Sequence, residues 1–184
     1  MALTDGTKIS LGTPCPDFDL PAMDGKQYQR DDFKDRKVLL VMFICNHCPY
    51  VKAVESRLIE LQREYKAQSV QLVGICSNDP TDYPEDSFAN LQRSWREKNY
   101  GFPYLHDLEQ NVARAFGAVC TPEFFVYGPD RKLAYHGRLD DNWQDSRAVK
   151  RRELKEAVDR LLTDQEPDPD QIPSMGCSIK WRRM

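Results

Sequence analysis

Two cysteines, Cys45 and Cys48, stand three residues apart where a continuous apolar run over residues 38–44 gives way to a helical pattern that starts near Pro49. Thiols at this spacing can form a disulfide across one turn of a helix. The start of a helix also presents unpaired backbone N–H groups and the positive end of the helix dipole, and both stabilise a thiolate. The pair therefore predicts a dithiol–disulfide redox site.

The two sulfurs are expected to have different roles. One sulfur of such a pair is exposed at the start of the helix as the thiolate nucleophile, and we assign this role to Cys45. Cys48 is expected to be more buried and to resolve the mixed disulfide, which releases the product. His47 stands between them, and as a cation it would lower the pKa of the first thiol. The other interpretation of His47 is a solvated side chain with little effect.

Zinc is the main alternative ligand for a close cysteine pair. A structural zinc site uses four ligands, which usually come as two close pairs. The sequence holds no second C-x-x-C and no H-x-x-H pattern. We therefore predict no metal and no dissociable cofactor, because the sulfurs themselves carry the electrons.

Four further cysteines are Cys15, Cys76, Cys120 and Cys177. Cys15 lies between two prolines, Cys76 ends an apolar strand and Cys120 precedes a proline turn. Packing as small buried apolar residues is the favoured interpretation of these three. Cys177 lies in the C-terminal tail, and two interpretations of it are equally weighted: a third partner in thiol exchange, or an incidental residue in a tail that its apolar neighbours anchor.

Composition excludes several classes of function. The 184 residues include 26 basic and 29 acidic side chains, a net charge of −3, which gives no electrostatic reason to expect nucleic acid or an anionic membrane as a partner. Residues 1–12 show neither the basic cluster nor the apolar run of a secretory signal, and no apolar stretch reaches the roughly 18 residues of a membrane span. We expect a cytoplasmic protein, in which cysteines do not form a framework of structural disulfides.

The elements that position the pair follow from periodicity. Residues 38–44 and 70–76 are apolar almost throughout, as in buried parallel strands. Apolar residues recur at helical spacing between them, which predicts a right-handed strand–helix–strand unit with the cysteines at the start of its helix. The apolar helical positions are Val51, Val54, Leu58, Leu61 and Tyr65.

The rest of the pattern completes one mixed sheet. Asp24-Gly25 predicts an N-terminal hairpin, and Asp107 and Gly117 bound a short helix over residues 109–116. The other expected elements are helices over residues 88–99 and 154–162 and strands over 123–127 and 132–136. We predict an α/β fold with a central mixed sheet of four to five strands flanked by helices. Its domain spans residues 1–163, and residues 164–184 form an acidic, proline-rich linker and a cysteine-containing tail.

Together these residues resemble the thioredoxin fold, in particular the AhpC/TSA-like (alkyl hydroperoxide reductase/thiol-specific antioxidant) branch of the thioredoxin-like superfamily. Gly12 and the stretch from Cys15 to Leu20 are similar to the entry motif of that branch, with Cys15 in its alanine place. Cys45 to Cys48 occupy the place of the redox pair. Thr121-Pro122 occupies the place of a cis-proline turn that faces the pair, and the resemblance implies that its backbone binds an extended substrate segment.

Two departures change what the resemblance implies. The strand over residues 38–44 holds no acid to accept a proton, so Glu123 beside the proline turn is a candidate substitute; its other interpretation is an exposed carboxylate at a strand end. Cys48-Pro49 also matches the end of the peroxiredoxin motif, with Cys45 in its threonine place. A peroxiredoxin-like thiol peroxidase that attacks peroxide through Cys48, with Cys45 or Cys177 as the resolving thiol, is therefore the alternative function.

A third class is a metal-binding module on the same fold, with His47, Cys120 and His136 as the available ligands. The main prediction is an enzyme, a thioredoxin-like thiol–disulfide oxidoreductase. Its expected partners are a disulfide or peroxide substrate and an electron donor. The predicted site consists of catalytic Cys45 and Cys48, substrate-binding Thr121 and Pro122, and auxiliary His47, Glu123 and Cys177.

Overall fold

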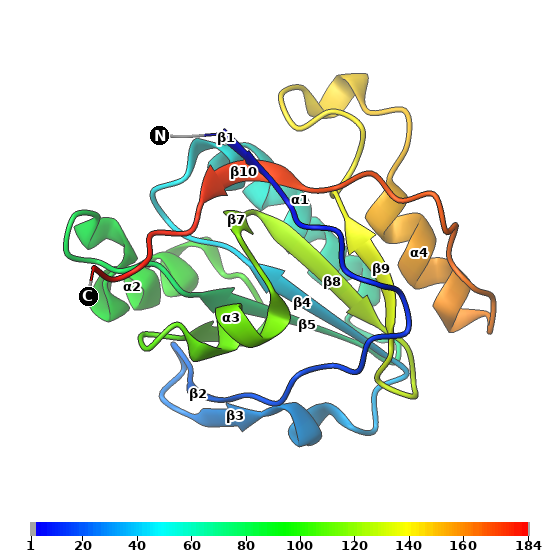
Figure 1. Cartoon of the computed structure of the whole chain (residues 1–184), viewed down its shortest axis with the longest axis horizontal. Helices are drawn as coiled ribbons and strands as arrows, with labels where there is room; N and C mark the ends of the chain where they lie inside the picture. Colours follow the sequence, from blue (N-terminus) through cyan, green and yellow to red (C-terminus); the bar gives the residue numbers. More distant parts are fainter. Residues whose placement is uncertain (1–2, 184) are drawn as a thin grey trace.

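The computed structural model describes residues 3–183, and its centre is a five-stranded mixed sheet in the order β6-β5-β4-β8-β9 (Figure 1). β4, β5 and β6 are parallel, whereas β8 pairs antiparallel with both β4 and β9. This arrangement confirms the predicted α/β fold. The strands are β4 (Val38–Phe43), β5 (Val70–Cys76), β6 (Tyr104–His106), β8 (Glu123–Tyr127) and β9 (Leu133–Gly137).

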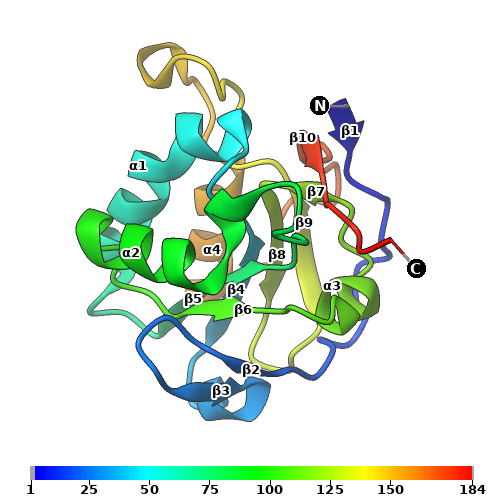
Figure 2. The ribbon, with the colours of Figure 1, turned by 90° about the vertical axis from the view of Figure 1, so that its left-hand side faces the viewer.

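Both faces of the sheet are covered (Figure 2). The side chains of α1, α2 and α4 pack in one apolar cluster, and those of α3 and the N-terminal hairpin pack in another. The helices are α1 (Pro49–Tyr65), α2 (Phe88–Lys98), α3 (Asn111–Phe116) and α4 (Glu153–Leu162). The hairpin consists of β2 (Asp19–Pro21) and β3 (Gln27–Gln29), and short 3₁₀ helices span Arg30–Phe33, Pro84–Asp86 and Ser146–Ala148.

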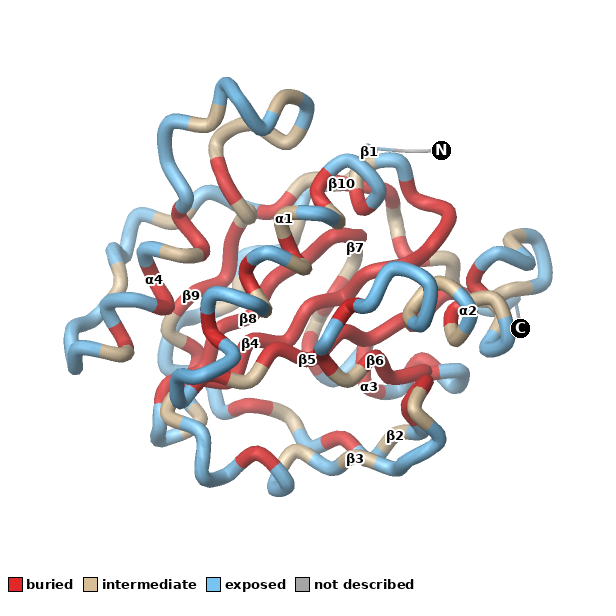
Figure 3. Tube along the Cα trace, turned by 180° about the vertical axis from the view of Figure 1, so that it is seen from behind, coloured by how far each residue is buried: buried red, intermediate tan, exposed pale blue. Residues whose placement is uncertain are grey.

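The central strand β4 explains why the site has a firm base. All of its residues are buried (Figure 3). Successive side chains alternate between the two clusters. Leu40 and Met42 pack on the side of α1, whereas Leu39 and Val41 pack on the side of α3. The predicted apolar stripe of α1 is likewise buried along its whole length. The end of β4 and the start of α1 are therefore fixed by the core.

A second, three-stranded sheet lies beside the start of α1, in the order β1-β10-β7 (Figure 1). Its middle strand comes from the predicted tail, and it pairs antiparallel with one strand near the N-terminus and with a second strand directly before the proline turn. The strands are β1 (Leu3–Asp5), β7 (Cys120–Thr121) and β10 (Met175–Ser178). The acidic linker before β10 is mostly exposed, and the division of the chain at residue 163 stays a prediction.

Two local features differ from the predictions. β6 was not predicted, because its three residues are too few to show a period. The short helix α3 begins at Asn111 rather than 109, although the Asp107 carboxylate does accept hydrogen bonds from the backbone N–H groups of Val112 and Ala113. Within residues 3–183 we find no helix with the length and apolar content of a membrane span.

Candidate functional site

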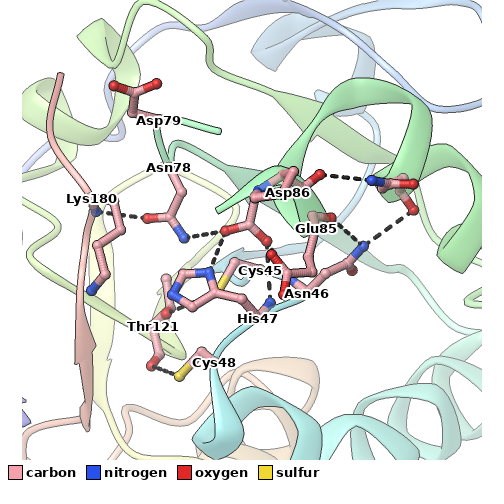
Figure 4. A network of polar contacts seen from close by, with 12 residues as sticks. Cys45, Asn46, His47, Cys48, Asn78, Asp79, Glu85, Asp86, Thr121 and Lys180 are labelled. Atoms are coloured by element: carbon pink, nitrogen blue, oxygen red, sulfur yellow. Dashed lines mark hydrogen bonds and ion pairs between the residues drawn. The ribbon is translucent and has the colours of Figure 1, made fainter. Parts of the chain in front are cut away.

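The two cysteines of the predicted redox pair lie in the connection from β4 to α1, and both sulfurs contact Thr121 (Figure 4). The Cys48 thiol donates a hydrogen bond to the Thr121 carbonyl oxygen at 3.1 Å. The Cys45 sulfur lies 3.4 Å from the Thr121 hydroxyl oxygen. The Thr121-Pro122 peptide bond is cis, as the resemblance implied. The structure therefore brings together the two cysteines and the proline turn that the sequence placed far apart.

Neither sulfur is on the surface of the protein. Cys45 is 2% exposed and Cys48 is fully buried, so the expectation of an exposed Cys45 beside a buried partner is wrong. The helix α1 begins at Pro49, as expected, so Cys48 is its N-cap residue; Cys45 lies in the preceding loop, where it contacts Thr121 from a distant part of the chain. Cys48 is the sulfur closest to the unpaired N–H groups of the first turn.

The two thiols differ in acidity in the sense opposite to the prediction. Burial raises the pKa of Cys45 above its ordinary value, and its shared hydrogen bond with Cys48 and the negative charge of Asp86 act in the same direction. The hydrogen bond from Cys45 lowers the pKa of Cys48, with further contributions from Cys177 and from the backbone N–H of Val51, against the opposing effect of burial. The favoured thiolate of the pair is therefore Cys48.

His47 is held by a buried aspartate that sequence reasoning missed. Its Nδ1 lies 2.5 Å from Oδ2 of Asp86, a side chain with no exposed surface (Figure 4). Its ring stacks on Tyr83 at 4.2 Å between centroids. The interpretation of His47 as a solvated side chain is wrong. Asp86 stands in a polar loop with three other acids within seven residues, so nothing in the sequence singles it out.

Asp86 also fixes the backbone between the cysteines. Its Oδ1 accepts hydrogen bonds from the N–H groups of Asn46 and His47 at 2.7 and 3.2 Å. Its Oδ2 accepts a further bond from the amide of Asn78, which follows β5. One buried carboxylate thus ties the loop that carries Cys45 to the end of the neighbouring strand.

The same residues form the one group in the described part of the chain with a metal-like ligand set. The ligand atoms of Cys45, His47 and Asp86 lie within 4.8 Å of one another. Both Asp86 oxygens already accept hydrogen bonds, however, so a metal ion would have to displace them. The predicted set of His47, Cys120 and His136 is not assembled, because His136 pairs with Glu123 instead.

Glu123 is fully buried, so its interpretation as an exposed strand-end carboxylate is wrong. One of its oxygens accepts hydrogen bonds from the backbone N–H groups of Val119 and Cys120, and the other lies 2.9 Å from Nε2 of His136. None of its hydrogen bonds in the described structure reaches Cys45 or Cys48. Glu123 thus organises the approach to the proline turn.

The tail covers the pair. Cys177 of β10 stands opposite Thr121 of β7, the residue that the sulfurs of Cys45 and Cys48 both contact, and it is 1% exposed. It belongs to the same apolar cluster as Cys45 and Cys48. The three cysteines that were expected to pack as small apolar residues, Cys15, Cys76 and Cys120, are also buried.

A cavity of about 350 Å³ lies beside the proline turn, between α1, β8 and the segment before β10. Apolar atoms of Val54, Pro122 and Phe124 contribute to its wall, and Asp5 and Asp141 add carboxylates. Ser174 and Met175 line it from the tail. The cavity therefore borders β10, the strand that carries Cys177.

A mixed five-stranded sheet, with two cysteines at the start of α1 facing a cis-proline turn, defines a protein of the thioredoxin-like class. The fold of a thiol:disulfide interchange protein from Chlorobium tepidum TLS agrees, with a TM-score of 0.62 and 18% identity over 85% of this chain and 98% of that chain. More particularly, the chain belongs to the AhpC/TSA family, whose model matches residues 11–136.

Two further relatives differ in how similar their sequences are to this chain. A hypothetical protein from Sinorhizobium meliloti 1021 has a solved structure with a TM-score of 0.94 and 40% identity, covering 98% of this chain and 100% of that one. Thiol-disulfide oxidoreductase ResA from Geobacillus thermodenitrificans (strain NG80-2) is 23% identical over 136 residues, 71% of this chain and 70% of its own length.

Proposed function

We propose that this chain is a thiol–disulfide oxidoreductase that works through a C-x-x-C dithiol formed by Cys45 and Cys48. The observation that carries the proposal is that both sulfurs, which lie at or just before the start of α1, contact the same residue, Thr121. A dithiol needs one sulfur that ionises readily and a second within reach of the resulting mixed disulfide. The similarity to a protein named as a thiol-disulfide oxidoreductase supports the same class of activity.

Cys48 is the sulfur that attacks first. Its thiolate forms a bond to one sulfur of the substrate disulfide, and the other substrate sulfur leaves as a thiolate that takes up a proton. The Cys45 thiol then loses its proton and attacks the Cys48 sulfur, which releases the second substrate thiol. The protein is left with a Cys45–Cys48 disulfide, and an electron donor restores the dithiol by the reverse exchange.

The raised pKa of Cys45 suits it to the second step. Burial and the charge of Asp86 keep its proton in place while Cys48 is the thiolate, so the hydrogen bond between the two sulfurs stabilises the reactive form. Asp86 and His47 act as positioning residues, because their hydrogen bonds fix the loop that carries Cys45. Thr121 contacts both sulfurs in the protonated dithiol, and the hydrogen bond that its carbonyl oxygen accepts from the Cys48 thiol is lost when Cys48 ionises.

A thiol peroxidase is the second candidate, and one observation favours it. Cys48 is the N-cap residue of α1, directly before Pro49, and its thiolate is the favoured one. The position that a peroxidase would fill with a threonine holds Cys45, whose thiol also has a single donor hydrogen. In that chemistry Cys48 would be oxidised to a sulfenic acid, which Cys45 would condense to the same disulfide with loss of water.

The two candidates differ in what the single variants do. With dithiothreitol as the reductant, we expect the wild type to reduce a protein disulfide such as that of insulin and to leave hydrogen peroxide largely unconsumed. Cys48→Ser and Cys45→Ser should each lose turnover on the disulfide, and Cys15→Ser should retain it. Peroxide consumption by the wild type that persists for a single turnover in Cys45→Ser would establish the peroxidase instead.

The partners follow from this chemistry. The substrate is a disulfide that reaches Cys48 past the tail, and the electron donor is a dithiol of lower reduction potential. We retain the expectations of a cytoplasmic setting and of no nucleic-acid or membrane partner as part of the proposal.

A further inference from the structure

The tail strand β10 occupies the edge at which the resemblance placed a substrate. β7 carries Thr121, and its pairing groups are used by the chain itself: Cys177 lies opposite Thr121, and Ser178 lies opposite Cys120. Proteins that bind extended segments by strand addition use such an edge for backbone hydrogen bonds. In this protein the segment at that edge is internal, and it carries a cysteine at the position facing the redox pair.

Three thiols meet at this point. Directly opposite residues of an antiparallel pair have Cα atoms about 4.5–5.5 Å apart, so Cys177 is held next to Thr121. The Cys48 sulfur is 3.1 Å from the carbonyl oxygen of the same Thr121. Cys48 and Cys177 lie in the same buried apolar cluster, and each side chain contributes to the pKa shift of the other.

The pairing of β10 with β7 depends on Gly176. A Cβ atom at this position would overlap the carbonyl carbon and oxygen of Thr121 and would lie 3.1 Å from the Pro122 nitrogen. Only a glycine lets β10 approach the proline turn this closely. The Gly6 N–H also donates a hydrogen bond to the Ser174 carbonyl oxygen, and the Ser174 hydroxyl donates to the Gly137 carbonyl oxygen. These contacts hold the strand in one register.

We propose that Cys177 is a third exchange thiol, presented to Cys48 by β10 as an internal substrate. The inference rests on the proposed function, since it requires Cys48 to take part in disulfide exchange. When the pair is oxidised, the Cys177 sulfur attacks Cys48 and gives up its proton. The Cys45–Cys48 bond breaks, a Cys48–Cys177 bond forms, and Cys45 takes up the proton. One disulfide and one thiol are present before the step and after it: the thiol passes from Cys177 on the tail to Cys45 in the loop, with no net oxidation.

The exchange gives the protein two oxidised forms. In the first, the disulfide lies in the loop before α1 and β10 is free to leave β7. In the second, the disulfide joins the tail to α1, and the edge of β7 stays closed to any external segment. Cys120 provides the internal comparison: side chains alternate along a strand, and its sulfur lies 3.7 Å from a Glu123 oxygen on the other side of β7.

The experiment uses the Cys45→Ser variant and one molar equivalent of a dipyridyl disulfide, which releases coloured pyridinethione at each exchange. Attack by Cys48 releases the first pyridinethione and leaves a pyridyl mixed disulfide. We expect Cys177 to displace the second pyridinethione, and peptide mass spectrometry to find a Cys48–Cys177 bridge. Cys45→Ser/Cys120→Ser should behave identically, whereas Cys45→Ser/Cys177→Ser should stop after the first release.

The outcomes separate this inference from the function it rests on. A Cys45→Ser protein that stops at a stable Cys48 mixed disulfide, or that bridges Cys48 to Cys120, overturns the role of Cys177 and leaves the proposed function intact. A Cys48 that does not react at all overturns both. The wild type gives a second measurement that needs no substitution: after mild oxidation with oxidised glutathione, both Cys45–Cys48 and Cys48–Cys177 bridges should be found, and absence of the second contradicts the inference.

Discussion

Gly176 lies against Thr121 so closely that a single added methyl group at position 176 would overlap the Thr121 carbonyl. Thr121 is also the residue that both sulfurs of the redox pair contact. The close approach of these two residues therefore connects the position of the tail to the accessibility of the thiols. Because Cys48 is fully buried and Cys177 of β10 stands opposite Thr121, we expect β10 to move before an external disulfide reaches Cys48.

Gly176→Ala should expose the pair. The added Cβ pushes β10 away from β7, and the loss of each hydrogen bond between these strands lowers the free energy needed to separate them by about 1 kcal/mol. A loss of about 1.4 kcal/mol raises the open population tenfold, so we expect Cys48 to react with a dipyridyl disulfide at least about tenfold faster. Gly128→Ala is the matched control, since its nearest neighbours at 3.4 and 3.8 Å leave room for a Cβ. Equal rates in the two variants would show that β10 does not limit access.

Asp86→Asn should destabilise the protein and change the acidity of Cys45. The substitution puts an amide where the buried carboxylate contacts His47 and accepts hydrogen bonds from Asn46 and Asn78, at a cost of about 1–3 kcal/mol in the free energy of unfolding. It also removes a negative charge that raises the pKa of Cys45, so this pKa should fall. Urea unfolding measures the first effect, and the pH dependence of Cys45 alkylation in the folded variant measures the second.

The control for that substitution is Asp82→Asn. Asp82 is exposed and forms an exposed ion pair with Arg183, so its loss should change stability by less than about 1 kcal/mol. An Asp86→Asn protein with unaltered alkylation of Cys45 would show that Asp86 supports the loop without influencing the thiol.

Glu123→Gln should separate folding from thiol chemistry. Its carboxylate accepts hydrogen bonds from the Val119 and Cys120 N–H groups and pairs with His136, and a side-chain amide satisfies this arrangement only in part. We expect a loss of about 1–3 kcal/mol in the free energy of unfolding. The pH profile of Cys48 alkylation should not move, because no hydrogen bond joins Glu123 to Cys48 in the described structure. A displaced profile would restore Glu123 as the proton acceptor considered from the sequence.

The parts of the fold that could be predicted are those with a local signal. The stripe from Val51 to Tyr65 repeats at helical spacing, and the structure buries every one of its residues. The continuous apolar runs identified β4 and β5 for the same reason. β6 has only three residues and is defined by its pairing with β5, so it leaves no local pattern.

The site was predicted in its members but not in their arrangement. Cys45, Cys48 and the Thr121-Pro122 turn do meet, as the resemblance implied. The order of acidity depends mainly on the contact between the two sulfurs and on the burial of Cys45, and both are set by distant segments that pack around the pair. Asp86 and β10 reach the pair through contacts between distant segments, which no local pattern in the sequence records.

The first thiolate of the pair is best tested by alkylation of the fully reduced wild type with iodoacetamide over a range of pH, with each cysteine quantified by peptide mass spectrometry. The folded pKa of Cys48 is lowered from 9.0, so its thiolate, and with it its reactivity, should persist as the pH falls below the ordinary thiol range and disappear only at the lowered pKa. The pKa of Cys45 is raised, so Cys45 should stay protonated and react only at higher pH. Modification of Cys48 ahead of Cys45 near pH 6 is the predicted result. Modification of Cys45 first, or of both along an ordinary thiol titration, would contradict the account.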